Sequence, residues 1–190
     1  MQFGKKILII AFSALVATGL YLAFGLAYKE PNKPPINIAS AETGLPLRLI
    51  IPEIGVDAKI QYVKTTANGA IGAPEEPWAV AWFSLSQKPG ETGSAIITGH
   101  YGQWKNGQGS VFHRLNEIKN GSKIYIENDG NNLLSFEVKE TRAFDFEDET
   151  TEIFGKNDGA WIVLITCQGK WLKDKKTYSE RLAVFAKLEN

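Results

Sequence analysis

Residues 161–167 read Trp-Ile-Val-Leu-Ile-Thr-Cys, and this segment sets the expectation for the fold. Its first five residues are apolar at odd and even positions alike, whereas a strand with one face in water alternates apolar and polar residues. The run therefore predicts a strand that is buried on both faces and lies at the centre of a sheet. Cys167, the only cysteine of the chain, follows directly on this central strand.

Around this segment, the folded part of the chain is predicted to be mainly β. Short runs rich in β-branched and aromatic residues are separated by Asn-Gly and Asp-Gly turns, as is typical of a barrel or sandwich. Helical signals are confined to 111–118 and 148–154, each long enough for about two turns. The predicted strands are 47–51, 58–63, 79–83, 95–98, 123–126, 133–140, 161–166 and 181–188.

The composition excludes several functional classes. The 190 residues include 21 Lys+Arg and 21 Asp+Glu, and 44% of them are hydrophobic, as in a globular protein rather than a disordered chain. A formal net charge of zero argues against a nucleic-acid partner, because neutralising phosphates requires a basic surface. One cysteine excludes an intramolecular disulfide framework and a cysteine-based zinc cluster.

The N-terminal region predicts attachment to a membrane. Lys5 and Lys6 precede the run 7–28, which contains no charged residue and is long enough to cross a bilayer as a helix. A cleaved signal peptide is the alternative, with Ala39-Ser40-Ala41 as its cleavage pattern, but the apolar run is longer than in an ordinary signal peptide. We expect an uncleaved single-pass anchor in the cell membrane, with the folded part on the extracytoplasmic side.

The predicted organisation has three parts. Residues 1–28 form a cytoplasmic tip and transmembrane anchor. Residues 29–46, which include Pro31, Pro34 and Pro35, form an extended tether. Residues 47–190 form the folded β domain.

Cys167 by itself supports several interpretations. The thiol could be a small buried core group, a partner of a cysteine in another chain, or a site of lipid attachment. The end of a buried strand could also hold it rigidly in a groove lined by loops, where Gly169 permits an open turn. A thiol that acts as a nucleophile requires a base or a cation close by.

Two histidines are candidates for the base. His100 follows the predicted strand 95–98, at a strand end like Cys167. His113 is predicted to point outward from the short helix 111–118, since Phe112 and Leu115 occupy its inward face. His100 is therefore the candidate base, and a turn histidine that binds a backbone carbonyl is the alternative.

Arg181 is the candidate for the positive charge that an oxyanion requires. It begins the last predicted strand, and the loop 168–180 lets this strand return antiparallel to 161–166. Arg181 would then lie close to Cys167. A surface ion pair with Glu180 is the alternative interpretation.

Taken together, these segments resemble the sortase family of cysteine transpeptidases. The resemblance is carried by Thr98-Gly99-His100, Leu164-Ile165-Thr166-Cys167 and Arg181, and similar segments at 49–56 and 110–124 extend it over 47–188. Val163 departs from the Thr-Leu-x-Thr-Cys pattern that is frequent in the family. The resemblance implies a closed eight-stranded sortase-like β-barrel with one or two short helices. The short, N-terminally anchored form looks most similar to classes D, E and F.

The resemblance also implies a reaction. Cys167 would attack the Thr–Gly carbonyl of a C-terminal sorting signal of the Leu-Pro-x-Thr-Gly type, and an amine of peptidoglycan or another surface amine would resolve the thioacyl-enzyme. His100 would transfer the protons and Arg181 would stabilise the oxyanion. Thr166, Gln168 and Trp171 are the candidate substrate-binding residues.

We expect no cofactor and no metal site. Some sortases use calcium, but the acidic cluster at 145–149 lacks the regular spacing of a calcium loop. An L,D-transpeptidase-like enzyme is a competing hypothesis, although residues 166–169 do not match the Ser-x-Gly-Cys core of that family. A catalytically inactive, membrane-tethered β-barrel that binds surface proteins is another.

Overall fold

The computed structural model describes residues 44–104, 107–148 and 151–189. The predicted anchor, 1–28, and all but the last residues of the predicted tether, 29–46, lie outside these described residues. In the described ranges, no helix combines the length and the apolar character that crossing a membrane requires.

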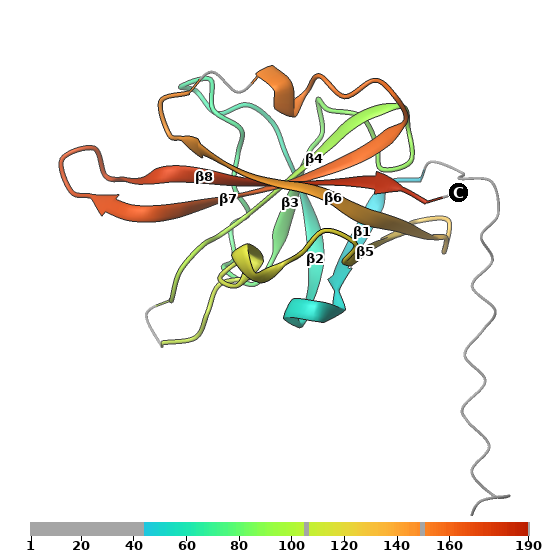
Figure 1. Ribbon diagram of the computed structural model, residues 1–190, viewed down its shortest axis with the longest axis horizontal. Coiled ribbons are helices and arrows are strands. Elements are labelled where there is room, and N and C mark those ends of the chain that lie inside the picture. The colour runs from blue at the N-terminus through green and yellow to red at the C-terminus, as the bar shows by residue number, and fades with distance from the viewer. Residues whose placement is uncertain (1–43, 105–106, 149–150, 190) are drawn as a thin grey trace, which may run out of the picture. The chain divides into compact units, whose positions relative to one another are not determined.

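Eight strands form a closed barrel in the described part of the chain (Figure 1). Around the barrel they follow the order β1-β2-β3-β4-β7-β8-β6-β5, and β5 closes onto β1. The pairs β2–β3 and β4–β7 are parallel and the others are antiparallel. The predicted mainly-β, eight-stranded barrel is confirmed. The strands are β1 Pro46–Ile51, β2 Val56–Val63, β3 Val80–Phe83, β4 Gly93–Gly99, β5 Lys123–Asn128, β6 Leu133–Asp145, β7 Ala160–Leu172 and β8 Thr177–Leu188.

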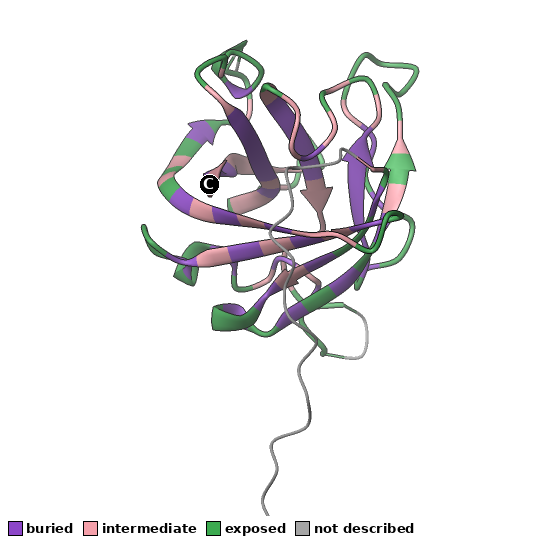
Figure 2. Ribbon diagram, turned by 90° about the vertical axis from the view of Figure 1, so that its right-hand side faces the viewer, coloured by how far each residue is buried: buried purple, intermediate pink, exposed green. Residues whose placement is uncertain are grey.

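The interior of the barrel holds one cluster of buried apolar side chains. Leu49, Phe136, Leu164 and Val184 reach it from four different strands, and each is fully buried. Because successive side chains of a strand point to opposite faces, these residues define the inner face of the sheet. Buried and more exposed residues alternate along several strands in Figure 2.

Residues 111–118 pack on this interior, but not as the predicted α-helix. Phe112, Leu115 and Ile118 are buried in the inner cluster at a spacing of three residues. This spacing fits the three residues per turn of a 3₁₀-helix. The segment accordingly contains the 3₁₀-helix η2, Leu115–Glu117.

The other predicted helix, 148–154, is also shorter than expected. It contains only the 3₁₀-helix η3, Thr151–Ile153, of which Ile153 is buried. A third 3₁₀-helix, η1 (Pro52–Ile54), follows β1. The described residues contain no α-helix.

A second apolar cluster covers the outer face of the sheet. It includes Val163 of β7, Phe185 of β8 and Ile96 of β4, together with Ile153 of η3. The strand β7 is therefore buried on its inner face by the barrel interior and on its outer face by this cluster. The prediction of a central, doubly buried strand at 161–166 is confirmed.

The hairpin of β7 and β8 is longer than the sequence predicted. Residues 168–180 were expected to form a loop, but β7 continues to Leu172 and β8 starts at Thr177. The outer part of the hairpin carries polar and exposed side chains, so its sequence lacks the apolar alternation that signals a strand. The rings of Trp171 and Tyr178 pack edge to face across it, with centroids 5.2 Å apart. A register shift accompanies Gly169, whose φ of +82° favours glycine.

The start of β1 and the end of β8 lie at the end of the barrel remote from this hairpin (Figure 1). Pro46 pairs with Asn128, whereas Ile51, at the other end of β1, pairs with Val56. The described chain thus enters the barrel at the end remote from the β7–β8 hairpin.

We predict that the inner cluster dominates stability. Leu164→Ala should lower the free energy of unfolding by about 3 kcal/mol, because it leaves a cavity beneath a fully buried side chain. Leu85→Ala is the matched control, because Leu85 is 64% exposed, and it should change stability by less than about 0.5 kcal/mol. Urea unfolding followed by tryptophan fluorescence measures both. Equal losses in the two variants would contradict this assignment of the core.

Candidate active site

The register of three neighbouring strands brings the three predicted catalytic residues together. In the antiparallel pair β7–β8, Cys167 lies directly opposite Arg181. In the parallel pair β4–β7, Thr98 is the partner of Ile165, so His100 lies at the level of Cys167 two residues further along. Neighbouring strands are about 5 Å apart. Imidazole, thiol and guanidinium therefore come from adjacent positions in the order β4, β7, β8.

Cys167 and Arg181 share the outer face of the sheet. Val163 and Phe185 belong to the outer apolar cluster, and Cys167 and Arg181 lie four residues from them along their respective strands. An even separation keeps side chains on the same face. The side chains of Cys167 and Arg181 thus lie on the outer face of the sheet, next to the outer apolar cluster.

His100 belongs to the same face. Ile96 of the outer cluster precedes it by four residues on β4, although β4 itself ends at Gly99. The backbone N–H of Phe112 donates to the His100 carbonyl at 3.0 Å and fixes the main chain there. The three predicted residues therefore face one side of the molecule.

A backbone carbonyl sets the tautomer of His100. The ring Nε2 lies 2.8 Å from the Pro74 carbonyl oxygen. Because a carbonyl only accepts, Nε2 carries the hydrogen and donates it. In the neutral ring Nδ1 then holds the lone pair, and it is the nitrogen left for proton exchange.

The loop that carries Pro74 is itself held in place. The Gln61 side-chain oxygen accepts a hydrogen bond from the backbone N–H of Glu75 at 2.9 Å, and the Gln61 amide donates to the Glu76 carboxylate. The Thr98 hydroxyl donates to the Gly72 carbonyl at 2.9 Å. These bonds stabilise the loop on both sides of Pro74.

Thr166 joins the strands on the inner side. Its side chain is buried, and its hydroxyl donates to the Gly99 carbonyl at 2.8 Å. It alternates with Cys167 and so points to the opposite face. The structure places Thr166 as a link between β7 and the residue before His100, away from the face on which a substrate would meet the thiol.

Arg181 is held by acceptors of its own strand. Nη1 donates to the carbonyls of Tyr178 at 3.1 Å and Glu180 at 3.0 Å, and Nη2 donates to the Thr177 hydroxyl at 2.8 Å. The predicted alternative, an ion pair with the Glu180 side chain, is not what the structure has. The Glu180 carboxylate instead accepts from the Gln168 amide at 2.8 Å.

The surroundings of Cys167 act on its thiol in two directions. Partial burial raises the pKa of the thiol above its ordinary value, because the charged thiolate loses hydration. The positive charge of Arg181 lowers the pKa and opposes part of this effect. At neutral pH the resting thiol is therefore mainly protonated, and a base is needed to make it nucleophilic.

Aromatic rings lie beside this group of residues. Trp171 is 53% exposed and contacts Tyr178, which in turn packs against Tyr101 with ring centroids 5.3 Å apart. Trp171 is thus on the surface of the β7–β8 hairpin, where the prediction of substrate contact remains a prediction. Trp82, by contrast, is a core residue.

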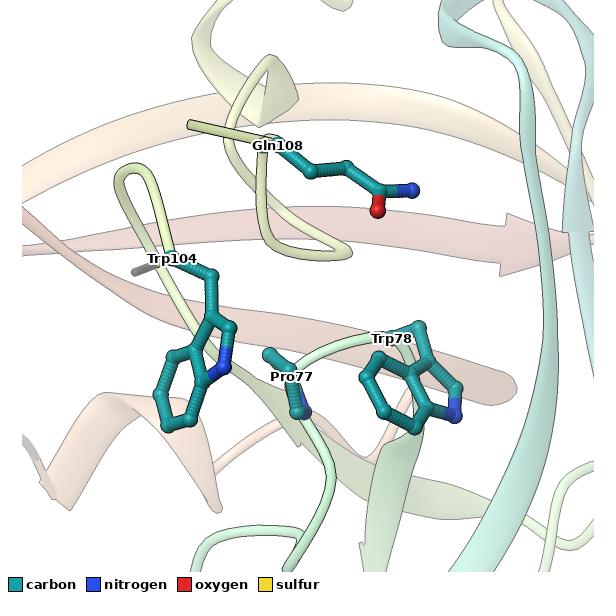
Figure 3. A pocket seen from close by; sticks show the side chains of 5 residues that line it. Pro77, Trp78, Trp104 and Gln108 are labelled. Atoms are coloured by element: carbon teal, nitrogen blue, oxygen red, sulfur yellow. The ribbon is translucent and has the colours of Figure 1, made fainter. Parts of the chain in front are cut away.

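A hollow lies between the segment that precedes β3 and the segment that follows His100. It is lined by Pro77, Trp78, Trp104, Gln108 and Gly109. Figure 3 shows the two indole rings on either side of Pro77. Trp78 is 65% exposed and Trp104 is 45% exposed.

His113 differs from its prediction. It was expected to be exposed, but it is half-buried, and its Nδ1 is buried without a hydrogen-bond partner. Its ring lies 6.3 Å from that of Tyr101. Because residues 111–118 do not form an α-helix, the helical face that would have exposed His113 does not exist.

The described residues include no group of three or more His, Cys, Asp or Glu side chains arranged to hold a metal ion. Arg48 and Arg142 take part in ion pairs away from these residues: Arg48 binds Asp57, and Arg142 binds Glu140 and Glu152.

Some contributors to the site could not be found from sequence. The Pro74 carbonyl acts through the backbone, and no residue type encodes that. Thr177 and Tyr178 lie in a segment predicted as loop, so nothing placed them near Arg181.

The family model for the sortase domain matches residues 49–189. Comparison with curated proteins gives no significant match. Sortase C1 of Streptococcus agalactiae, solved in complex with MTSET, is similar with a TM-score of 0.60 and 21% identity, over 79% of this chain and 71% of that chain.

Two further solved structures resemble the chain. Sortase A of Corynebacterium diphtheriae gives a TM-score of 0.58 and 25% identity, over 79% of this chain and 63% of that chain. A Clostridium perfringens sortase D5 transpeptidase gives 0.56 and 20%, over 77% of this chain and 79% of that chain. Because these neighbours carry the class letters A, C and D, the predicted class D, E or F stays a prediction.

The fold and the strand-end cysteine define a β-barrel enzyme of the cysteine transpeptidase kind. The chain belongs to the sortase family, since the family model covers nearly all of its barrel.

We predict that alkylation of Cys167 reports its environment. The midpoint of the pH dependence of iodoacetamide labelling should lie above that of an unstructured cysteine peptide, because burial raises the thiol pKa. Arg181→Gln removes the opposing charge and should move the midpoint further upward. Mass spectrometry at a series of pH values measures both, and a downward shift in the variant would contradict the assignment.

Proposed function

We propose that this protein is a membrane-anchored sortase that cleaves a Leu-Pro-x-Thr-Gly-like sorting signal and transfers the protein to a cell-wall or surface amine. The observation that carries the proposal is the meeting of His100, Cys167 and Arg181 on one face of three adjacent strands. Family membership supports the reaction class. The sequence of the sorting signal, the identity of the acceptor amine and the membrane anchor are our proposals.

The first half-reaction forms a thioester. The Cys167 thiol gives its proton to Nδ1 of His100, and the sulfur attacks the carbonyl carbon of the Thr–Gly bond. The C–N bond then breaks, and the imidazolium returns the proton to the departing amine. The Pro74 carbonyl accepts from Nε2 throughout, which leaves Nδ1 as the nitrogen that exchanges the proton.

Arg181 stabilises the negative charge on the carbonyl oxygen during attack. Three of its five N–H groups bind its own strand, and the N–H of Nε and one N–H of Nη2 remain for a substrate oxygen. The guanidinium also favours the thiolate. One cation thus serves both the nucleophile and the oxyanion.

The second half-reaction reverses the proton transfers. An incoming amine loses its proton to His100, attacks the thioester and displaces the sulfur, which regenerates the thiol. A thioester reacts more readily with an amine than with water, and this favours transfer over hydrolysis. We expect no cofactor to take part.

A membrane anchor suits this reaction. The uncharged run 7–28 behind Lys5 and Lys6 supports a single-pass anchor with the barrel outside the membrane. Surface proteins and their cell-wall acceptors would both be present at that face. Tethering would raise the effective concentration of enzyme there.

The test supplies a quenched Leu-Pro-x-Thr-Gly peptide with an amine acceptor. Fluorescence should rise, a thioester mass should appear on Cys167, and Cys167→Ala should abolish both signals. A binding module without catalysis would give neither signal in the natural protein. Absence of the thioester with a library of such peptides would overturn the proposed function.

We predict that Arg181→Lys lowers kcat/KM by about 100-fold without unfolding the barrel, because a point charge cannot replace a planar guanidinium. Arg114→Lys is the matched control, since Arg114 is exposed and pairs only with Glu117 among the described residues. Near-normal turnover by Arg181→Lys would remove Arg181 from the site.

A further inference from the structure

The guanidinium of Arg181 is bound at both of its terminal nitrogens by its own hairpin. Nη1 binds two backbone carbonyls, those of Tyr178 and Glu180. Nη2 binds the Thr177 hydroxyl, at 2.8 Å. Thr177 thus provides the one side-chain acceptor that the described residues offer to Arg181.

The two bonds at Nη1 hold one end of the guanidinium, to two backbone carbonyls. They leave the Nη2 end without a protein acceptor, on a long arginine stem that has many rotamers. The bond from Nη2 to the Thr177 hydroxyl holds this second end. The hydrogens left over, one on Nε and one on Nη2, then point in a defined direction.

Thr177 is placed to do this by the strand itself. It is the first residue of β8, pairs with Leu172, and lies four residues from Arg181 on the same face of the strand. It is half-buried, so water competes less for its hydroxyl than at the exposed turn 173–176. The hydroxyl therefore connects the outer end of the hairpin to the guanidinium.

We propose that Thr177 is a positioning residue that holds the Arg181 guanidinium in the orientation required for transition-state stabilisation. This inference rests on the proposed function, because it assigns Arg181 the oxyanion. Thr177 does not touch the substrate and acts through Arg181.

The first experiment compares two substitutions at one position. Thr177→Val keeps the branched shape and the strand preference but loses the acceptor, whereas Thr177→Ser keeps the hydroxyl. Thr177→Val should lower kcat about tenfold, as expected for loss of one hydrogen bond to a charged group, with KM for the peptide changed less than about twofold. Thr177→Ser should stay within about threefold of the natural enzyme.

Thr141→Val is the matched control. Thr141 lies on β6 and is exposed, and its hydroxyl has no hydrogen-bond partner among the described residues, so loss of that hydroxyl should leave kcat unchanged. Thermal unfolding of all three variants identifies any loss of folded protein.

A double-mutant cycle separates positioning from simple damage to the hairpin. In an Arg181→Lys background, Thr177→Val should lower kcat by less than about twofold, because the guanidinium that Thr177 orients is no longer present. A tenfold loss in that background too, or equal losses in the Val and Ser variants, would overturn the proposal.

A final arm needs no substrate. Arg181 lowers the pKa of Cys167, so a displaced guanidinium should move the alkylation midpoint of the thiol to higher pH in Thr177→Val but not in Thr177→Ser. An unchanged midpoint together with unchanged kcat would overturn the proposal. If the natural protein forms no thioester, the proposed function fails, and this arm alone decides whether Thr177 positions Arg181.

Discussion

The register of β7 between β4 and β8 is the constraint on which the site depends. β7 pairs with both neighbours along its buried part, in parallel with β4 and antiparallel to β8. Side chains alternate between faces, so a slip of one residue would move the thiol of Cys167 to the inner face. The apolar side chains on both faces of β7 make that slip costly, because each inner side chain would move to the outer cluster and each outer one to the barrel interior. Packing of the core thereby sets the geometry of the reaction.

Hydrogen bonds then orient groups that the strands bring together. The Thr166 hydroxyl links β7 to Gly99, and the Pro74 carbonyl fixes the ring of His100. Arg181 is held by its own strand, without a carboxylate partner among the described residues. A paired carboxylate would neutralise the charge that the thiolate and the oxyanion require. Binding by neutral acceptors leaves that charge in place while limiting its movement.

Much of this arrangement was predictable from sequence, and the reasons differ from element to element. The run 161–165 predicts a strand buried on both faces, since apolar residues at every position leave neither face suited to contact with water. Cys167, His100 and Arg181 were found through the chemistry a thiol nucleophile needs and through resemblance to sortases. Their roles remain a proposal, and the structure supplies the register and the shared face.

Other features could not be predicted, for physical reasons. The outer part of the β7–β8 hairpin is stabilised by backbone pairing and by the packing of Trp171 against Tyr178. Neither interaction requires apolar and polar residues to alternate, so the sequence of this part does not indicate a strand. In segment 111–118, the spacing of the apolar residues is compatible with an α-helical or a 3₁₀ turn. Packing against the barrel interior favours the 3₁₀-helix that the structure has. The anchor at 7–28 lies outside the described residues and stays a prediction.

A crystal structure of the enzyme with a sorting-signal mimic joined to Cys167 would test whether the three residues act on one carbonyl. We expect the carbonyl oxygen beside the sulfur to accept a hydrogen bond from Arg181, with the imidazole of His100 on the opposite side of the thiol. A structure in which His100 or Arg181 lies on another face of the barrel, away from the sulfur, would contradict it.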